Sequence, residues 1–311
     1  MKKILITGGA GYVGSVLTQQ LLQKGYKVRV LDNLFHHQMS HIPFFSDKNY
    51  EFIRGDIREK EDVKKSLQGV DAIINLAAIV GAPQCRMKPK LAEEVNVLGV
   101  RNINQLRSGD QPLIYASTGS VYGALQEICT EESPVNPTSV YGKTKLTAEK
   151  DILEKGNSTA LRFATAFGVS PRLRVDTLLI NDFVYRACEE KEIIVYQADV
   201  RRTFIHIQDM ARCFIYILEN FGKANGEIFN AGSEKLNFTK KEIAEKIKER
   251  IPYYLYFAEI GEDADKRDYE VSYEKIKNLG FEIEVSLEEG IDELVRAFRA
   301  LPEKLMRSQP L

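Results

Sequence analysis

The sequence predicts an α/β protein in which a doubly wound parallel sheet is followed by a smaller C-terminal α+β lobe. Strand-like and helix-like segments alternate through the first half of the chain, and this rhythm changes after Gly168. The length of 311 residues suits two ordinary domains, or one large α/β domain with an appended lobe. We therefore predict one domain over residues 1–168 and a second over residues 169–311.

Composition limits the classes of partner. The 43 Lys and Arg residues nearly cancel the 44 Asp and Glu residues, which leaves a formal net charge of -1. A chain without a basic field is not expected to bind nucleic acid. No apolar run approaches the roughly 20 residues that span a bilayer, so no membrane partner is predicted. The four cysteines are widely spaced, which is typical of reduced thiols and predicts a cytoplasmic protein.

The first strand–helix–strand unit has the clearest pattern. Residues 2–7 form a short apolar run that ends in a glycine cluster. Helical spacing of apolar residues from Tyr12 onward stops at Gly25, and the next strand covers residues 27–31. A unit of about 30 residues is long enough for a parallel crossover connection.

The same alternation continues along the chain. Up to Gly168, the spacing predicts strands over residues 51–54, 72–76, 113–116 and 159–163, and helices over residues 59–67, 90–106 and 140–155. Beyond it, the spacing predicts a helix over residues 177–190, strands over 193–196 and 203–205, and a helix near 207–220 that packs back on the first domain. Thr239 and Glu242 fit a capping box that opens a further helix.

Glycines at positions 8, 11 and 14 lie between the first strand and the first helix. Without side chains, the backbone can approach a pyrophosphate, and the helix N-terminus supplies free N–H groups. Turns of this kind use glycine in any case, so the context carries the prediction. Asp32 follows Gly11 by 21 residues, where a carboxylate accepts from a ribose 2′-hydroxyl and repels a 2′-phosphate. The pattern predicts a bound dinucleotide, and NAD rather than NADP.

A tyrosine and a lysine form the second candidate site. Tyr141 and Lys145 lie four residues apart on the predicted helix over residues 140–155, so they share a face. A neighbouring ammonium lowers the pKa of a phenol from about 10 by favouring the phenolate. Alone, the pair fits an ordinary amphipathic helix. The hydroxyl-rich residues 117–123 follow the strand over residues 113–116, at the edge where open α/β sheets bind ligands, and favour a proton-transfer site.

Taken together, the motifs resemble an extended short-chain dehydrogenase/reductase of the NAD-dependent epimerase/dehydratase family, which acts on nucleotide sugars. The resemblance covers nearly the whole chain and implies a Rossmann-type NAD-binding domain and a lobe that binds the nucleotide sugar. Its motifs are the glycine fingerprint, Asp56-Ile57-Arg58, Asn75-Leu76-Ala77-Ala78, Asn96-Val97-x-Gly99, S-T-x-x-V-Y-G from Ser117, Y-x-x-x-K from Tyr141, Leu161-Arg162-Phe163, and the run from Arg202 to Asp209.

The resemblance implies roles for particular residues. Tyr141 would be the catalytic base, Lys145 would lower its pKa and hold the nicotinamide ribose, and Thr118 takes the place of the family's catalytic Ser or Thr. The implied cofactor-binding residues are Gly8, Gly11, Tyr12, Val13, Asp32, Asn33, Asp56, Ile57, Leu76, Ala77, Ala78, Asn96, Tyr141 and Lys145. The implied substrate-binding residues are Thr118, Arg202 and Arg267, with both arginines at the diphosphate, and no metal site is implied.

Departures from the family pattern narrow the expected reaction. Dehydratases of the family carry an acid after the catalytic threonine, whereas Gly119 and Ser120 stand here, so elimination of water lacks its acid. The family's usual asparagine after Leu161-Arg162-Phe163 is replaced by Ala164-Thr165. Two runs, Ser170-Pro171-Arg172-x-Arg174 and Asp265-Lys266-Arg267-Asp268-Tyr269, resemble a subgroup linked to dehydrogenation of heptose or other modified nucleotide sugars at C4.

We therefore expect NAD-dependent oxidation at C4 of a nucleoside-diphosphate sugar, with a 4-epimerase as the main hypothesis. A 4-dehydrogenase, for example on a GDP-heptose-like sugar, needs the same three residues and stays open as an alternative. A dehydratase and a non-catalytic NAD-binding sensor are weaker alternatives. The family also implies a homodimer that associates through the helices over residues 90–106 and 140–155.

Overall fold

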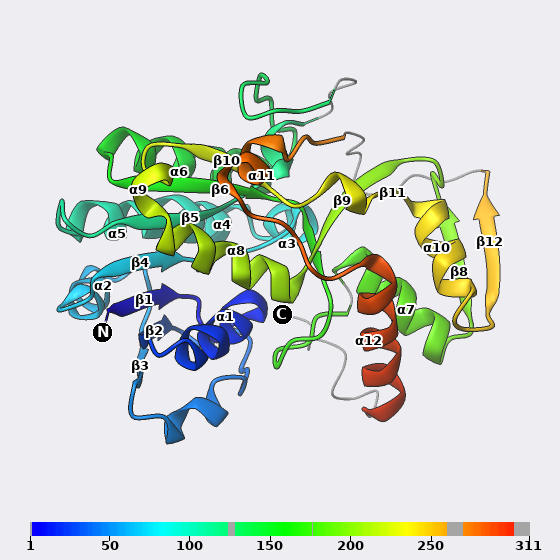
Figure 1. Cartoon of the computed structure of the whole chain (residues 1–311), viewed down its shortest axis with the longest axis horizontal. Helices are drawn as coiled ribbons and strands as arrows, with labels where there is room; N and C mark the ends of the chain where they lie inside the picture. Colours follow the sequence, from blue (N-terminus) through cyan, green and yellow to red (C-terminus); the bar gives the residue numbers. More distant parts are fainter. Residues whose placement is uncertain (1, 124–127, 176, 260–269, 302–311) are drawn as a thin grey trace.

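Seven parallel strands form the centre of the computed structural model, which describes residues 2–123, 128–175, 177–259 and 270–301 (Figure 1). The strands lie in the order β10-β6-β5-β4-β1-β2-β3, and each neighbouring pair is parallel. This order confirms the predicted doubly wound, Rossmann-type sheet. The strands are β1 (Lys3–Thr7), β2 (Lys27–Asp32), β3 (Tyr50–Arg54), β4 (Ala72–Asn75), β5 (Leu113–Thr118), β6 (Ser158–Phe163) and β10 (Ile228–Ala231).

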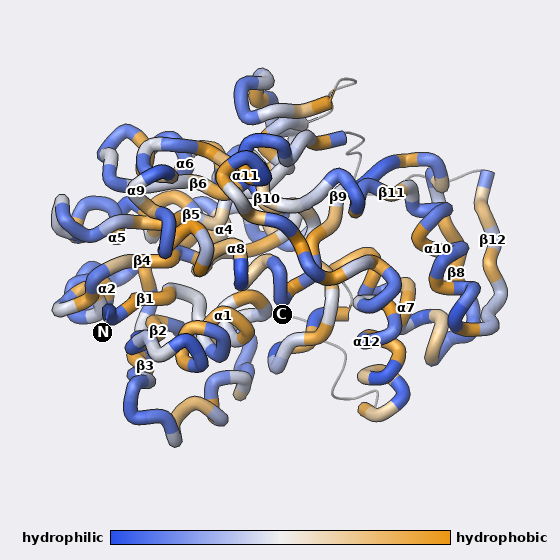
Figure 2. Tube along the Cα trace, viewed as in Figure 1, coloured by the Kyte–Doolittle hydropathy of each residue, from blue (hydrophilic) through white to orange (hydrophobic). Residues whose placement is uncertain are grey.

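The central strands are hydrophobic because helices cover both faces of the sheet. Ile4 and Ile6 of β1 enter one core cluster, whereas Leu5 between them enters the other. Figure 2 shows the same hydrophobic character along β4 and β5. The first face is covered by α1 (Tyr12–Gln23) and α8 (Ile207–Glu219), and the second by α2 (Lys60–Leu67), α5 (Val100–Leu106) and α6 (Val140–Lys155).

The helix predicted over residues 90–106 differs from the structure. It consists of α4 (Pro89–Glu93), a π-helical stretch (Glu94–Gly99) and α5, and it is preceded by α3 (Ala82–Met87). Asn96 lies in the wider π-helical turn, where its amide accepts from the Ile79 N–H (2.8 Å) and donates to the Ile79 carbonyl oxygen (3.0 Å). Such turns often occur at functional sites, and this one fixes the loop after β4.

The smaller lobe has its own core. A three-stranded sheet of β7 (Thr165–Phe167), β9 (Arg201–His206) and β11 (Asn237–Thr239) lies beside a parallel pair, β8 (Glu192–Tyr196) and β12 (Tyr254–Ala258) (Figure 1). The helices of this half are α7 (Leu179–Glu189), α9 (Phe221–Ala224), α10 (Lys240–Lys248), α11 (Glu274–Leu279) and α12 (Leu287–Ala300). The predicted capping box opens α10: the Thr239 N–H donates to the Glu242 carboxylate (2.7 Å), and the Glu242 N–H donates to the Thr239 hydroxyl (3.1 Å).

The two halves of the chain interleave. Strand β10 lies in the large sheet beside β6, although it falls within residues 169–311. Helix α8 packs on α1, and the Gln20 side-chain amide donates to the Gln208 side chain (2.8 Å). The second half therefore supplies β10, α8, α9 and α11 to the larger lobe, and the division after residue 168 stays a prediction. Physically, β10 satisfies the edge of β6 that the first half leaves unpaired.

The cysteines of this fold are buried. Cys85, Cys129, Cys188 and Cys213 are all free thiols. Burial raises the pKa of each thiol, which makes all four poor nucleophiles. Among the helices of the described ranges, none is long and apolar enough to cross a membrane.

Candidate active site

A cavity of about 700 Å³ runs along the carboxyl ends of the large sheet. Parallel strands end there side by side, so residues that follow different strands meet although the sequence separates them. The predicted site residues that line this cavity are Gly8, Gly11, Tyr12, Val13, Asp32, Asn33, Asp56, Ile57, Leu76, Ala77, Ala78, Thr118, Tyr141 and Lys145. One cavity therefore contains the glycine motif, the acidic residues and the predicted catalytic set.

The glycine-rich turn depends on the absence of side chains. Gly8 has a φ of +72°, and a Cβ atom there would lie 2.7 Å from the Ala77 nitrogen. A Cβ atom on Gly14 would lie 2.5 Å from the Gly8 carbonyl oxygen. Helix α1 then begins at Tyr12 with no side-chain cap, so its first N–H groups have no intrahelical partner. The turn therefore leaves backbone donors for an anion, as a diphosphate requires.

Asp32 ends β2 at the cavity. Its carboxylate accepts from the Ala10 N–H (3.0 Å) and from the Leu34 N–H (2.8 Å), which fixes its position. Burial raises the pKa of Asp32, and the two backbone hydrogen bonds oppose this rise. The fixed carboxylate fits the donor of a ribose hydroxyl and does not fit a second phosphate.

A second acidic group follows β3. The Asn33 side-chain amide donates to the Asp56 carboxylate (2.9 Å), and Arg58 donates to it from Nη2 (2.8 Å). Burial opposes ionisation of Asp56, but the hydrogen bonds from Arg58 outweigh it and lower the pKa. Ile57 between them is buried. The turn after β3 thus presents a polar edge beside an apolar surface, which suits a flat heterocyclic base.

The predicted catalytic residues lie on α6 and at the end of β5. The Ser139 hydroxyl caps α6 by accepting from the Gly142 N–H (3.0 Å), and this places Tyr141 and Lys145 on the first turns of the helix. Thr118 is the last residue of β5, because the strand continues two residues beyond its predicted end. Its hydroxyl donates to the Ser120 hydroxyl (3.2 Å). Helix and strand together deliver two hydroxyls and an amine to one cavity.

Lys145 is almost completely buried, with 3% of its surface exposed. Its ammonium lies 4.1 Å from the centroid of the Tyr115 ring. Burial lowers the pKa of Lys145 to about 7, although Glu149 and Cys85 act in the opposite direction. With a pKa near 7, the Lys145 side chain can carry the charge that stabilises a phenolate, and a bound ligand can change its protonation.

A buried polar network, which the sequence argument missed, lies behind Lys145. We call it the Glu149 network; its core is Ser117, Tyr122, Glu149, Arg162 and Asn230. Arg162 forms an ion pair with Glu149 (2.7 Å), and both side chains are at least 96% buried. Ser117 donates to the same carboxylate, and Arg162 donates to the Tyr122 hydroxyl (3.1 Å), which in turn donates to Asn230 (2.6 Å). The sequence feature that could have indicated this network is Glu149, which follows Lys145 by one helical turn on α6.

Of the remaining predicted site residues, two do not line the cavity and a third lies outside the described residues. Asn96 is fully buried behind it and acts on the backbone of Ile79 and on the Thr144 hydroxyl (3.1 Å). Arg202 lies on β9, buried, where it donates to the Arg201 carbonyl oxygen (2.9 Å). The third, Arg267, lies outside the described residues. Asn96 supports the loop after β4, and its cofactor-binding role stays a prediction.

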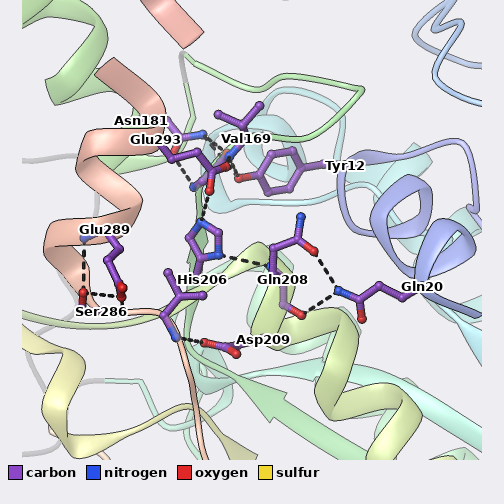
Figure 3. Close-up of polar contacts among 12 residues, drawn as sticks. Tyr12, Gln20, Val169, Asn181, His206, Gln208, Asp209, Ser286, Glu289 and Glu293 are labelled. Atoms are coloured by element: carbon purple, nitrogen blue, oxygen red, sulfur yellow. Dashed lines mark hydrogen bonds and ion pairs between the residues drawn. The ribbon is translucent and has the colours of Figure 1, made fainter. Parts of the chain in front are cut away.

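Tyr12, which lines the cavity, also links the two lobes. Its phenol donates to the Gly168 carbonyl oxygen (2.6 Å) and points toward Asn181 in the smaller lobe (Figure 3). Burial raises its pKa. Nearby, His206 caps α8 and forms an ion pair with Glu293 of α12 (3.3 Å). This junction joins the glycine-rich turn to the smaller lobe.

Two arginines complete the lining of the cavity. Arg172 and Arg174 belong to the segment after β7 and lie at the same cavity as Asp32 and Tyr141. The sequence marked this arginine-rich run but gave it no role. Only the folded chain shows that the run reaches the cofactor side of the cavity.

The fold and this cavity have the features of a dinucleotide-dependent enzyme. The side-chain-free turn, the uncapped helix N-terminus and Asp32 fit the diphosphate and ribose of such a cofactor.

Comparison with known proteins gives the family. Residues 4–232 match the model of the NAD dependent epimerase/dehydratase family, and the chain belongs to this family. Its cofactor is NAD.

Individual relatives perform several reactions. The chain is 30% identical to UDP-glucuronic acid decarboxylase 1 of Arabidopsis thaliana, over 96% of this chain and 70% of the relative. It is 28% identical to UDP-glucose 4-epimerase 1 of Oryza sativa subsp. japonica, over 95% and 93%.

Two solved structures resemble the whole fold. A UDP-glucuronic acid 4-epimerase from Bacillus cereus, in complex with UDP-glucuronic acid and NAD, has a TM-score of 0.85 at 25% identity, over 96% of this chain and 99% of that one. A dTDP-glucose 4,6-dehydratase from Streptomyces venezuelae with NAD and TYD bound has a TM-score of 0.87 at 26% identity, over 97% and 99%.

Proposed function

We propose that this chain is a 4-epimerase of nucleoside-diphosphate sugars. The observation that carries the proposal is that Thr118, Tyr141 and Lys145 line one cavity together with the glycine-rich turn. A protein that only bound NAD would need the turn but not the other three side chains. Similarity to 4-epimerases over nearly the whole chain supports the same reaction.

The side chains of the chain account for the proton chemistry. Tyr141, as phenolate, takes the proton of the C4 hydroxyl while that oxygen becomes a carbonyl. Thr118 donates a hydrogen bond to the same oxygen, and the ammonium of Lys145 stabilises the phenolate. When bound, NAD supplies the acceptor and donor of the C4 hydride. Inversion requires the keto sugar to present its other face before Tyr141 returns the proton.

Other outcomes begin with the same oxidation. A 4-dehydrogenase would release the oxidised sugar, and a dehydratase needs an acid, for which Gly119 and Ser120 offer no group. A decarboxylase is the second candidate, favoured by the 30% identity to UDP-glucuronic acid decarboxylase 1. In that reaction, a ketone at C4 would allow a carboxylate on C5 to leave as carbon dioxide.

The diphosphate of the sugar nucleotide is proposed to bind Arg202 of β9 and Arg267. This assignment follows the family motif, and Arg267 lies outside the described residues. The expected result of Arg202→Gln is a higher KM for the nucleotide sugar with unchanged affinity for NAD.

A homodimer is proposed to form through the helices over residues 90–106 and 140–155. Leu98 and Leu106 are exposed in the first of these segments, with 48% and 38% of their surfaces accessible. Exposed apolar side chains favour burial against a second copy. Leu98→Glu is expected to lower the mass measured by light scattering from that of a dimer to that of a monomer.

The reaction is tested with UDP-, GDP-, CDP- and dTDP-sugars, followed by NMR and mass spectrometry. Inversion at C4 with no change in mass supports the epimerase, whereas loss of carbon dioxide supports the decarboxylase. Tyr141→Phe is expected to abolish turnover, and Tyr254→Phe, a change at an exposed tyrosine, leaves it unchanged. Turnover near the wild-type rate in Tyr141→Phe contradicts the proposal.

A further inference from the structure

Arg172 and Arg174 are cations for which the proposed reaction has no use. They follow β7 and line the cavity beside Gly11 and Asp32, at its cofactor side. Neither residue belongs to the proton-transfer set, and their charges face a cavity whose other ionic groups already have roles. The question is which anion they bind.

The segment that carries the two arginines is fastened to the glycine-rich turn. The Ser170 hydroxyl donates to the Tyr12 carbonyl oxygen (2.7 Å) and lies 3.0 Å from the Ser15 hydroxyl. The Tyr12 phenol donates in return to the Gly168 carbonyl oxygen (2.6 Å). These contacts hold residues 168–170 on the first turn of α1, so the side chains that follow are delivered to the end where its free N–H groups lie.

The positive charge at this end is not balanced. Within the described ranges, the guanidinium of Arg172 makes no hydrogen bond or ion pair, and that of Arg174 donates only to the Thr177 hydroxyl (2.6 Å). The pKa of Arg172 is lowered to about 10, first by burial and then by the neighbouring charge of Arg174, while Asp32 acts in the opposite direction. Half-buried cations without a counter-ion are costly, and an anionic ligand removes this cost.

The excess of positive charge also affects a nearby histidine, His36. Burial lowers the pKa of His36 to about 4, and Arg172 and Arg174 are the next causes. Lys88 also faces this group. Asp32 is the acid that acts on Arg172, and its single negative charge does not balance two guanidinium groups and the Lys88 ammonium. The surplus therefore remains for a ligand.

We infer that Arg172 and Arg174 form a clasp on the diphosphate of NAD, opposite the N–H groups of the glycine-rich turn. Arg172 lies within electrostatic range of Asp32, the residue proposed for the adenosine ribose, and Arg174 lies within range of Tyr12 and Tyr141. All five residues line the same cavity. The diphosphate of NAD lies between its two nucleosides. Two guanidinium groups provide the charge-assisted hydrogen bonds that a diphosphate accepts.

The clasp has a consequence for the reaction, which rests on the proposed function. Residues 168–170 are held on α1 by hydrogen bonds with Tyr12, so a clasp carried by the residues that follow is expected to slow the release of NAD. A retained cofactor suits an epimerase, which returns the hydride to the sugar that supplied it. A dehydrogenase must instead exchange NADH for NAD in each turnover.

The test measures binding, not activity. Cofactor-free wild-type protein, Arg172→Gln, Arg174→Gln and the double variant are titrated calorimetrically with NAD, ADP and adenosine. For the double variant we expect the Kd for NAD and ADP to rise about 10–100-fold, the loss typical of charge-assisted hydrogen bonds, with adenosine unchanged. Less NAD is also expected to co-purify with it. Arg299→Gln, a change at an exposed arginine of α12, is the matched control and keeps wild-type affinity.

Two results would overturn the clasp. One is a Kd for NAD within about twofold of wild type in the double variant. The other is a loss confined to UDP and UDP-glucose, because the arginines would then bind the substrate diphosphate. Far-ultraviolet circular dichroism and Arg172→Lys, which keeps the charge, separate a folding defect from a lost contact. The clasp and the proposed reaction are tested separately. The affinity for NAD of the arginine variants tests the clasp, whereas the turnover of Tyr141→Phe tests the reaction, so either can fail without the other.

Discussion

The Glu149 network and the clasp arginines differ in charge balance: Arg162 lies in a buried network, whereas Arg172 and Arg174 line the cavity. In the Glu149 network, Arg162 is matched by a carboxylate 2.7 Å away, and both are nearly inaccessible. At the clasp, Arg172 has no such partner among the described residues. A buried ion pair such as Arg162–Glu149 has a structural role, because each charge is neutralised within the protein and needs no ligand. An unbalanced pair of cations indicates a ligand.

The largest expected effect comes from unbalancing the network. Arg162→Met leaves the Glu149 carboxylate buried without its cation, which is expected to lower the free energy of unfolding by about 3–5 kcal/mol. Arg101→Met breaks the exposed Arg101–Asp151 pair between α5 and α6 and is expected to cost less than about 1 kcal/mol. Urea unfolding measures both. Equal losses of unfolding free energy in Arg162→Met and Arg101→Met would contradict the expectation that the buried pair matters more for stability than the exposed one.

Lys145 allows the same contrast to be tested by pH. Its folded pKa of about 7 lies below the unfolded value of 10.5, so below pH 7 both states carry the ammonium and only the folded state bears the cost of burying it. In cofactor-free protein, Lys145→Met is expected to be more stable than wild type by a few kcal/mol at pH 6. The advantage shrinks as the pH rises from 7 toward 10.5. A pH-independent difference in urea unfolding would show that the burial cost is not electrostatic.

The smallest effect is expected at the clasp. Arg172→Gln removes a half-buried cation that no described carboxylate pairs with, so cofactor-free protein is expected to be at least as stable as wild type. Saturating NAD should then stabilise wild type more than the variant, because the ligand binds only the folded state of each. Thermal unfolding with and without NAD measures the difference. A large loss without NAD would make Arg172 a structural residue like Arg162.

Much of the larger lobe follows from the sequence. Apolar runs and glycine turns predicted its alternating strands and helices because each signal lies within a few neighbouring residues. The motif residues Asp32, Tyr141 and Lys145 reach one cavity because parallel strands and the helices after them end at one edge. The π-helical turn at Asn96 was not predictable in this way, since its amide is fixed by a loop 17 residues away.

The sequence by itself determined the doubly wound fold and the catalytic and glycine motifs, and with them the family, since these depend on local patterns at fixed spacing. Only the tertiary structure decided that β10 returns to the large sheet, that Glu149 pairs with Arg162, and that Arg172 lies beside the cofactor turn. Each of these depends on contacts between distant segments, and burial and charge balance, which separate a structural arginine from one that awaits a ligand, exist only after the chain has folded.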